Sequence, residues 1–346
     1  MNNQQNENQA TNGSHVGRRG FLKGAGLAAI ASTFMGMLPE KVQAQSTAWT
    51  QAGNNNHVIE LQEAGEGDAS EEGDVTLDYY GHCAFQITSP AGVTMMFDPW
   101  RNDPSGAWGL WYPEEFPKTV VDIGVSTHAH FDHDAIDRLE ATMLLDRMVG
   151  TYQFSDVKIT GIADKHACVA PGWYNWTNAL AEFGQEACPP NNPGHMDMAM
   201  YVVETGGLRI LIWGDNRPDP PENVWEQIGE IDILTLPVDG SQHILSYDQG
   251  DEIVAKLKPS IVIPTHYLCE GVSLTLSTLQ DADEWVDSQK SKTLLDKPSL
   301  LLNKEEVQEM KQEFMYFQSN TVITSTGQAS IVPHNQARVK SGSLVW

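Results

Sequence analysis

Residues 127–134 read Thr-His-Ala-His-Phe-Asp-His-Asp and follow a short apolar run, Ile123-Gly124-Val125-Ser126. Three histidines and two aspartates therefore fall within one short loop after a predicted buried strand. Imidazole nitrogens and carboxylate oxygens are ligands that suit Zn²⁺ and similar first-row metals. A lone histidine is commonly explained by packing, but this cluster is not. The pattern predicts a metal site at the end of a strand, where loops carry function.

The H-x-H-x-D-H spacing of residues 128–133 resembles the signature of the metallo-β-lactamase superfamily. Gly81-His82-Cys83-Ala84-Phe85 and Asp98-Pro99-Trp100 are similar to the opening motifs of one branch of that superfamily. This branch includes the ascorbate-phosphate lactonase-like hydrolases and the N-acyl-phosphatidylethanolamine phospholipase D-like enzymes. The resemblance covers residues 75–267. It implies an α/β (α+β) fold, a four-layer αββα sandwich with a dinuclear metal centre at the sheet edges.

The same resemblance implies a ligand set. Metal one takes His128, His130 and His195, metal two takes Asp132, His133 and His266, and Asp215 bridges them. His195 is preferred for the third position because it immediately precedes the predicted strand 198–203, and His166 is the alternative. An aspartate at position 215 departs from the zinc β-lactamases that use a thiolate there, which lowers the expectation of antibiotic hydrolysis. The expected cofactors are two divalent ions, zinc first, with manganese or iron as alternatives.

Three residues are expected to act in catalysis: Asp132, Asp215 and His243. Two ions ~3.5–4 Å apart lower the pKa of a shared water, so no serine or cysteine nucleophile is required. Asp215 would hold the ions together, and Asp132 would accept a hydrogen bond from the hydroxide. His243 lies in the loop after the predicted strand 231–236, where it either contacts the substrate or is an exposed loop residue. For His82 a structural role in a turn is expected.

Strands are expected at residues 75–80, 83–88, 93–97, 123–126, 198–203, 208–213, 231–236 and 261–264, on β-branched and aromatic content. Apolar residues at helical spacing predict helices over 134–145, 247–257, 279–288 and 304–317. Residues 74–346 then form the hydrolase domain, with 268–346 as a helical C-terminal extension. Aromatic clusters at 100–116 and 173–176 suit either loop packing or an apolar wall beside the metals.

The net charge of −25 would be repelled by phosphate backbones and anionic lipid surfaces. Nucleic acid is therefore excluded as a partner, as is stable membrane association of the mature chain, and a small-molecule substrate is expected. An oligomer is left open. The four cysteines, Cys83, Cys168, Cys188 and Cys269, form no CxxC pair. They are either disulfide-bonded in an oxidising compartment or buried free thiols.

Residues 1–44 have the features of an export signal. Arg18 and Arg19 precede Phe-Leu-Lys, an apolar run at 25–38 and a small-residue cleavage site near Ala44. The paired arginines resemble a twin-arginine signal, which exports folded proteins, and an uncleaved anchor is the alternative. The export machinery is thus an expected partner, and the expected location is periplasmic or secreted. Residues 45–73 are acidic and glycine-rich, which predicts a flexible lead-in.

Together these features predict a metal-dependent hydrolase. The lactonase-like resemblance favours a lactone or related carboxylic ester as substrate. A phosphodiester, as in the phospholipase D-like enzymes, is the alternative. A non-catalytic metal-binding protein of the same fold is a third possibility.

Overall fold

The computed structural model describes residues 49–52, 58–61, 68–167, 198–323, 337–340 and 343–345. The chain divides into two units, 1–47 and 48–346, and all the described residues belong to the second. The signal predicted at 1–44 therefore lies outside the described residues. Among the helices that are described, none has the length and apolar character needed to cross a bilayer.

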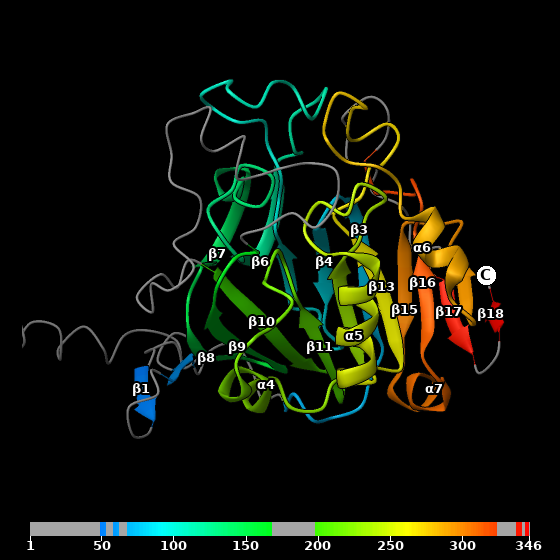
Figure 1. The fold of residues 1–346 in the computed structure, drawn as a ribbon. Helices are drawn as coiled ribbons and strands as arrows, with labels where there is room; N and C mark the ends of the chain where they lie inside the picture. Colours follow the sequence, from blue (N-terminus) through cyan, green and yellow to red (C-terminus); the bar gives the residue numbers. More distant parts are fainter. Residues whose placement is uncertain are drawn as a thin grey trace, which may run out of the picture. The chain divides into compact units, whose positions relative to one another are not determined.

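Two large sheets form the body of the molecule (Figure 1). The first, in spatial order, comprises β1 (Trp49–Ala52), β2 (Val58–Leu61), β8 (Gly150–Phe154), β9 (Val157–Asp164), β10 (Met198–Thr205), β11 (Leu208–Ile212), β12 (Ile233–Pro237), β13 (Ile261–Thr265), β16 (Glu313–Tyr316) and β14 (Lys292–Leu294). The second comprises β18 (Ser343–Val345), β17 (Ala337–Lys340), β15 (Ser299–Leu302), β3 (Val75–Gly81), β4 (Ala84–Thr88), β5 (Thr94–Phe97), β6 (Thr119–Ser126) and β7 (Leu139–Asp146). Both sheets mix parallel and antiparallel pairs. The predicted two-sheet sandwich is confirmed.

The central strands are apolar on both faces. All five residues of β12 and of β13 are buried, and seven of the eight in β10. Strands buried on both faces are near-continuous runs of valine, isoleucine and leucine, because helices or a second sheet cover each side. β11, β12 and β13 pair in parallel, so their C-terminal ends reach the same edge of the sheet. That edge is where the polar residues of the sequence gather.

The described α-helices are short. They are α4 (Glu222–Ile228), α5 (Tyr247–Leu257), α6 (Asp283–Ser288) and α7 (Lys304–Glu309), with a 3-10 turn η2 (Ile136–Arg138) before β7. The predicted helix at 247–257 matches α5, which begins with a capping box between Ser246 and Gln249. Trp285 of α6 packs on Phe314 of β16 and approaches α5 at Gly250. These two helices thus cover the ten-stranded sheet (Figure 1).

The helix predicted over 134–145 is wrong. Only η2 is helical there, and residues 139–146 form β7, which pairs in parallel with β6 over seven residue pairs. Leu139 and Leu145 are buried, whereas Leu144 is 47% exposed. The leucines and methionine that suggested one face of a helix are divided between the two faces of a strand. Pairing with β6 decided the conformation over local propensity.

The helical extension predicted at 268–346 is also wrong. Apart from α6 and α7, its described residues supply five strands, which join both sheets. β15 pairs antiparallel with β3, and β16 pairs in parallel with β13. The segment is therefore part of the sandwich. The range 45–73, expected to be a flexible lead-in, contributes β1 and β2, and β2 pairs with β8.

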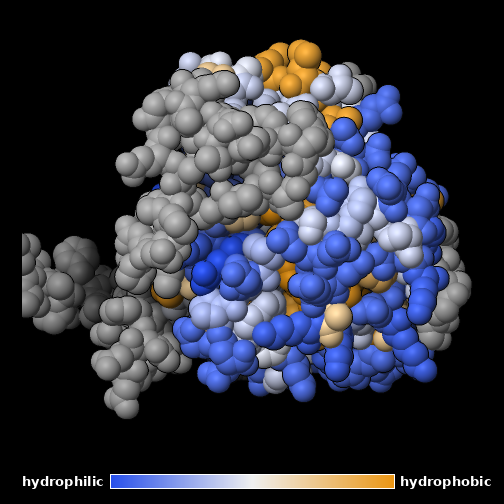
Figure 2. Space-filling view, in the orientation of Figure 1, coloured by the Kyte–Doolittle hydropathy of each residue, from blue (hydrophilic) through white to orange (hydrophobic). Residues whose placement is uncertain are grey.

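The face shown in Figure 2 is mostly hydrophilic, as the charge of −25 requires, with hydrophobic side chains gathered at one end. Of the four cysteines, Cys83 and Cys269 are free and buried. Cys168 and Cys188 lie outside the described residues. For the two described cysteines, the buried-thiol alternative holds.

Candidate metal centre

The histidines meet where the two sheets meet. The H-x-H-x-D-H loop leaves the end of β6, His82 lies in the β3–β4 turn, and His266 directly follows β13. Backbone hydrogen bonds tie these elements together: the N–H of His266 donates to the carbonyl of His82 at 3.1 Å, and that of Ala199 donates to Thr127 at 2.9 Å. Because strand ends from both sheets converge here, residues far apart in sequence become neighbours.

One group of possible ligands contains His128, His130, His166 and Asp215, whose ligand atoms all lie within 4.8 Å of one another. Nε2 of His128 is 3.7 Å and Nε2 of His166 is 3.4 Å from Oδ2 of Asp215. His130 is exposed, and its ring lies 4.5 Å from that of His166. The imidazole beside His128 and His130 is thus that of His166, the alternative in the sequence prediction. His195, the preferred residue, lies outside the described residues.

Local backbone geometry holds His166 against Asp215. His166 forms an isolated antiparallel bridge with Asn216, and the N–H of Ala167 donates to the carbonyl of Asp215 at 2.8 Å. Gly214 has a φ of +57°, and a Cβ there would stand 2.4 Å from Met198 Cε and 2.9 Å from Thr127 Oγ1. Only glycine combines that conformation with that close approach. The Gly-Asp pair at the end of β11 therefore has a physical reason.

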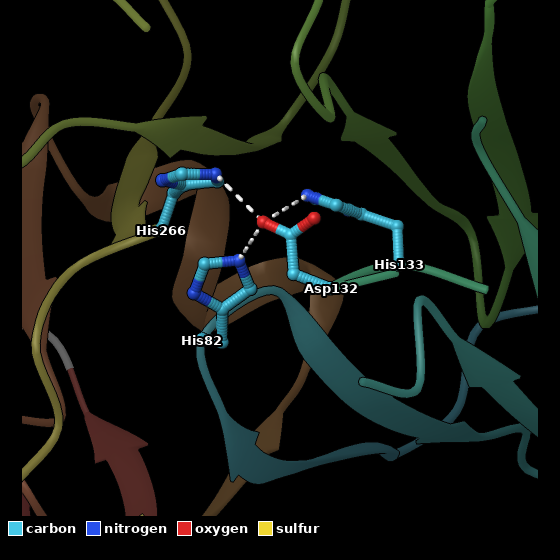
Figure 3. Close-up of side chains that lie close together, drawn as sticks. All are labelled: His82, Asp132, His133 and His266. Atoms are coloured by element: carbon cyan, nitrogen blue, oxygen red, sulfur yellow. Dashed lines mark hydrogen bonds and ion pairs between the residues drawn. The ribbon is translucent and has the colours of Figure 1, made fainter. Parts of the chain in front are cut away.

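A second group contains His82, Asp132, His133 and His266 (Figure 3). Oδ2 of Asp132 lies at its centre, 3.1 Å from Nε2 of His82, 3.4 Å from Nε2 of His266 and 3.7 Å from Nε2 of His133. All four residues are buried. His82, expected to be structural, is thus one of the four. A glycine-histidine turn before a strand was the only signal in the sequence.

Asp215 contacts both groups. Its Oδ1 is 3.3 Å from Nε2 of His133, and its Oδ2 is 3.2 Å from Nε2 of His266. The same Oδ2 faces His128 and His166. This carboxylate therefore has the position that a group shared by two cations requires.

The electrostatics are those of tightly packed opposite charges. Burial opposes the ionised form of Asp132 and Asp215, but the neighbouring imidazoles outweigh it and hold the pKa of both carboxyls well below the usual range. Burial likewise opposes the charged form of His266, yet Asp215 and Asp132 raise its pKa to about 10. The pKa of His133 is also raised. Burial lowers it, but the nearby carboxylates of Asp215, Asp132 and Asp98 raise it by more.

Three residues at this edge have left-handed backbone conformations: His82 at φ 57°, Asp98 at 46° and His266 at 61°. A non-glycine residue in this region costs about 1–3 kcal/mol and persists only where its surroundings impose it, which is common at functional sites. Each of the three follows directly on a strand. At each of these residues the left-handed conformation turns the chain out of the strand, so that the side chain can contact residues from the other strand ends.

Asp98 orients two of the histidines, a role that the sequence did not indicate. It is fully buried and accepts hydrogen bonds from Thr127 N–H at 2.7 Å and Thr127 Oγ1 at 2.8 Å, and its Oδ2 lies 2.9 Å from His133 Nδ1. Because Asp98 accepts from Thr127 and from His133, Nδ1 of His133 carries a proton, and Nε2 is the nitrogen that would give up its proton to bind a metal. Thr127 Oγ1 in turn contacts Nδ1 of His128 at 3.0 Å. Such outer contacts set the tautomer of metal-binding histidines.

The donor set fits a cation. Four buried ligand atoms, Nε2 of His128, His133 and His266 and Oδ1 of Asp215, form no hydrogen bond of normal geometry. Buried polar atoms without such a bond are rare, and each calls for an explanation such as an ion. Cys83 forms a further candidate group with His133 and Asp215. Burial raises the pKa of its thiol well above the usual value, so Cys83 is protonated in the absence of a metal.

His243 lies beside the second group. Its ring is buried, stacks on that of His266 at 5.4 Å, and contacts Thr278 Oγ1 through Nδ1 at 3.1 Å. Burial lowers the pKa of His243 to about 3, so the imidazole is neutral. Trp111 meets the rings of both His243, at 6.1 Å, and Phe131, at 5.1 Å. The exposed-loop alternative for His243 is therefore wrong.

Of the aromatic residues at 100–116, most pack in the core. Trp100 stacks on Tyr112 at 4.3 Å and meets Phe116 edge-on, and all three are at most 1% exposed. Two members of the set also reach the candidate site through ring contacts: Trp111 meets His243, as above, and Tyr112 meets His82 edge-on at 6.0 Å. Trp173, Tyr174 and Trp176 lie outside the described residues.

The family model described as "Beta-lactamase superfamily domain" matches residues 76–266. This range holds both ligand groups. The chain belongs to the metallo-β-lactamase superfamily.

Among curated proteins, the chain is similar to a UPF0173 metal-dependent hydrolase of Anaeromyxobacter sp. (strain K), 26% identical over 226 residues, covering 56% of this chain and 75% of the relative. A second UPF0173 metal-dependent hydrolase, of Myxococcus xanthus, is 24% identical over 208 residues, covering 58% and 72%. Among solved structures, a metallo-β-lactamase superfamily protein of Thermotoga maritima is similar, with a TM-score of 0.48 and 22% identity, covering 70% of this chain and 98% of that one.

Proposed function

We propose that this superfamily member is a metal-dependent hydrolase whose centre holds two divalent cations. The observation that carries the proposal is the pair of four-residue ligand groups that share the Asp215 carboxylate at one edge of the sandwich. The names of the curated relatives, metal-dependent hydrolases, support the same class of activity. Zinc is the first choice of metal, since imidazole and carboxylate ligands suit it.

The proposed ligands differ from the sequence prediction in two places. His128, His130 and His166 hold the first cation, with His166 in the place first given to His195. Asp132, His133 and His266 hold the second, and His82 adds a fourth ligand atom to that group. Asp215 stands between the two. Asp98 keeps His133 in the tautomer that presents Nε2 to the ion.

When bound, two such cations supply a hydroxide at neutral pH and polarise a carbonyl or phosphoryl oxygen. The chain's own residues do the rest. Asp132 and Asp215 would bring negative charge that offsets part of the charge of the ions. The carboxylate of Asp132 could also accept a hydrogen bond from the attacking water. His243, neutral and held by Thr278, is placed to hydrogen-bond the substrate or leaving group rather than to act as a charged acid.

For the substrate we propose a lactone or related carboxylic ester, from the resemblance to the lactonase-like branch. A phosphodiester is the second candidate, from the phospholipase D-like branch. The test is one assay on the zinc-loaded chain with a panel of small lactones and a chromogenic phosphodiester, using Asp215→Ala as the blank. Turnover of lactones alone supports the first proposal. Turnover of the phosphodiester alone overturns it in favour of the second.

Metal analysis tests the centre separately from the chemistry. Two zinc ions per chain are expected after loading and dialysis, and less than one would overturn the catalytic proposal in favour of a non-catalytic role. The matched pair His166→Ala and His195→Ala tests the third histidine. We expect His166→Ala to lose one ion and His195→Ala to keep both. The reverse result would restore the assignment made from sequence.

We also propose export by the twin-arginine route to the periplasm or medium, supported by residues 17–44. The paired substitution Arg18→Lys with Arg19→Lys should retain the protein in the cytoplasm, measured by fractionation and immunoblotting. Export of the double variant at the wild-type level would refute the route. Size-exclusion chromatography with light scattering would settle the oligomeric state, which we leave open.

A further inference from the structure

A cavity of about 290 Å³ opens beside the first ligand group. Its described lining comprises His128, Ala129, His130, Arg147, Val149, Ala163, His166 and Met198. Three of the proposed metal ligands therefore face this space. Of the residues in that lining, Arg147 is the one that is always cationic. In a chain with only 21 lysines and arginines against 46 acidic residues, an arginine in the same cavity lining as three proposed ligands calls for a reason.

The guanidinium of Arg147 is held in a defined orientation. Its Nε donates to Oδ1 of Asp146 at 2.8 Å and its Nη2 donates to Oδ2 at 2.6 Å. The side chain remains 41% exposed. These two hydrogen bonds use the Nε and Nη2 edge of the guanidinium, and Nη1 takes no part in them. An arginine oriented by one carboxylate in this way can still donate to a second oxyanion.

The backbone at Arg147 is hydrogen-bonded to the end of the strand that precedes the histidine motif. The N–H of Arg147 donates to the carbonyl of Ser126 at 2.9 Å, at the last residue of β6. The N–H of Met148 donates to the hydroxyl of Tyr201 at 2.9 Å, and Tyr152 donates to the carbonyl of Val149 at 3.1 Å. The segment 147–149 is thus tied to both sheets.

Gly161 of β9 permits this placement. A Cβ on Gly161 would lie 2.0 Å from the carbonyl oxygen of Met148, a distance that no side chain tolerates. The left-handed φ of 54° at Arg147 turns the chain at the same point. The left-handed φ of Arg147 and the missing side chain at Gly161 together let residues 147–149 pack against the strand ends beside His128.

We propose that Arg147 binds an anionic group of the substrate, a carboxylate or a phosphate, within this cavity. The proposal rests on the proposed hydrolase function and specifies its substrate class. A chain of net charge −25 repels anions at long range, so an anionic substrate needs a local cation to fix its orientation. Val149, Ala163 and Met198 line the same cavity and give an apolar surface to the uncharged part of the molecule.

The test compares two lactones that differ by one charge: γ-butyrolactone and its γ-carboxylate derivative. Arg147→Gln should raise the KM for the carboxylated lactone by about 10- to 100-fold, the range for losing a hydrogen bond to a charged group, and change kcat and the neutral lactone little. Arg147→Lys should recover part of the loss. Lys256→Gln is the charge-matched control, because Lys256 lies over Trp225 and away from the ligand groups. Equal effects on both lactones, or none, would overturn the proposal.

A binding measurement separates this inference from the proposed activity. Calorimetric titration of the zinc-loaded chain with 2-hydroxyglutarate or with inorganic phosphate needs no turnover. Weaker binding of the carboxylate alone in Arg147→Gln identifies a carboxylate site, and weaker binding of phosphate alone identifies a phosphate site. Unchanged binding of both refutes the role of Arg147, even if lactones are hydrolysed. A loss of binding in this variant supports it, even if neither lactone is a substrate.

Discussion

Replacing Asp98 by asparagine tests whether the outer hydrogen bonds decide metal affinity. Asparagine has nearly the same shape and tolerates the left-handed φ of 46°. Its remaining oxygen can still accept from Thr127 N–H. An NH₂ group replaces the oxygen that now lies 2.8 Å from Thr127 Oγ1 and 2.9 Å from His133 Nδ1. The substitution therefore removes an acceptor without removing volume.

The consequence follows from the tautomer of His133. An NH₂ group only donates, so Nδ1 of His133 must accept and the ring proton moves to Nε2. Nε2 is the atom 3.3 Å from Asp215 that we assign to the second cation, and a protonated nitrogen cannot bind a metal. Loss of such a partner typically lowers metal affinity by about 10- to 100-fold. This corresponds to about 1.4–2.8 kcal/mol of binding free energy.

Competition between the protein and a chromophoric chelator for zinc would measure both sites. We expect Asp98→Asn to weaken the site of His133 by that factor and the site of His128 by a smaller one, because Thr127 Oγ1, which contacts His128 Nδ1, loses its acceptor. Asp156→Asn is the matched control, because Asp156 is also buried and accepts from Ser89 Oγ and Ala91 N–H, but it is not among the residues of the centre. Unchanged affinity at both sites in Asp98→Asn, or an equal loss in the control, would refute the reasoning. Urea unfolding of the metal-free variants would show whether the fold is intact.

Three further outcomes are expected. Gly161→Ala should lower the free energy of unfolding by about 1–3 kcal/mol, because its Cβ overlaps the Met148 carbonyl. Gly250→Ala should not lower it, because the new Cβ would have ordinary contacts at 3.4 Å or more. Equal free energies of unfolding for the two variants in urea would contradict this. Zinc loading at pH 7.5 should release at least two protons per chain, because the raised pKa values of His133 and His266 (about 10 for the latter) keep both rings charged without metal, and a hydroxide formed from a bound water would add a third. Calorimetric heats independent of the buffer would contradict this. A chain ending at Tyr267 should lack a cooperative thermal transition, since it loses β15 and β16 from the two sheets, and a melt close to that of the full chain would disprove that dependence.

Local patterns in the sequence were sufficient for much of the fold. The strands at 75–80, 198–203 and 261–264 and the helix at 247–257 have clear apolar patterns and turn signals, and the structure has them. The prediction failed where long-range pairing overrides local preference. Residues 139–146 form a strand because β6 offers them hydrogen bonds, and the segment after 268 supplies strands to both sheets because β3 and β13 have edges to pair with.

The chemistry of the site was likewise determined by residue type and spacing. Imidazoles and a carboxylate in the order of residues 128–133 indicate a metal, whatever surrounds them. Which further side chains meet them is a question of distance in space. His166 lies opposite Asp215 because a single bridge to Asn216 holds it there, and His82 reaches Asp132 because its backbone carbonyl accepts from the N–H of His266. These contacts join residues 50 or more positions apart, and no local sequence pattern encodes such pairings, so only the tertiary structure decided the ligand groups.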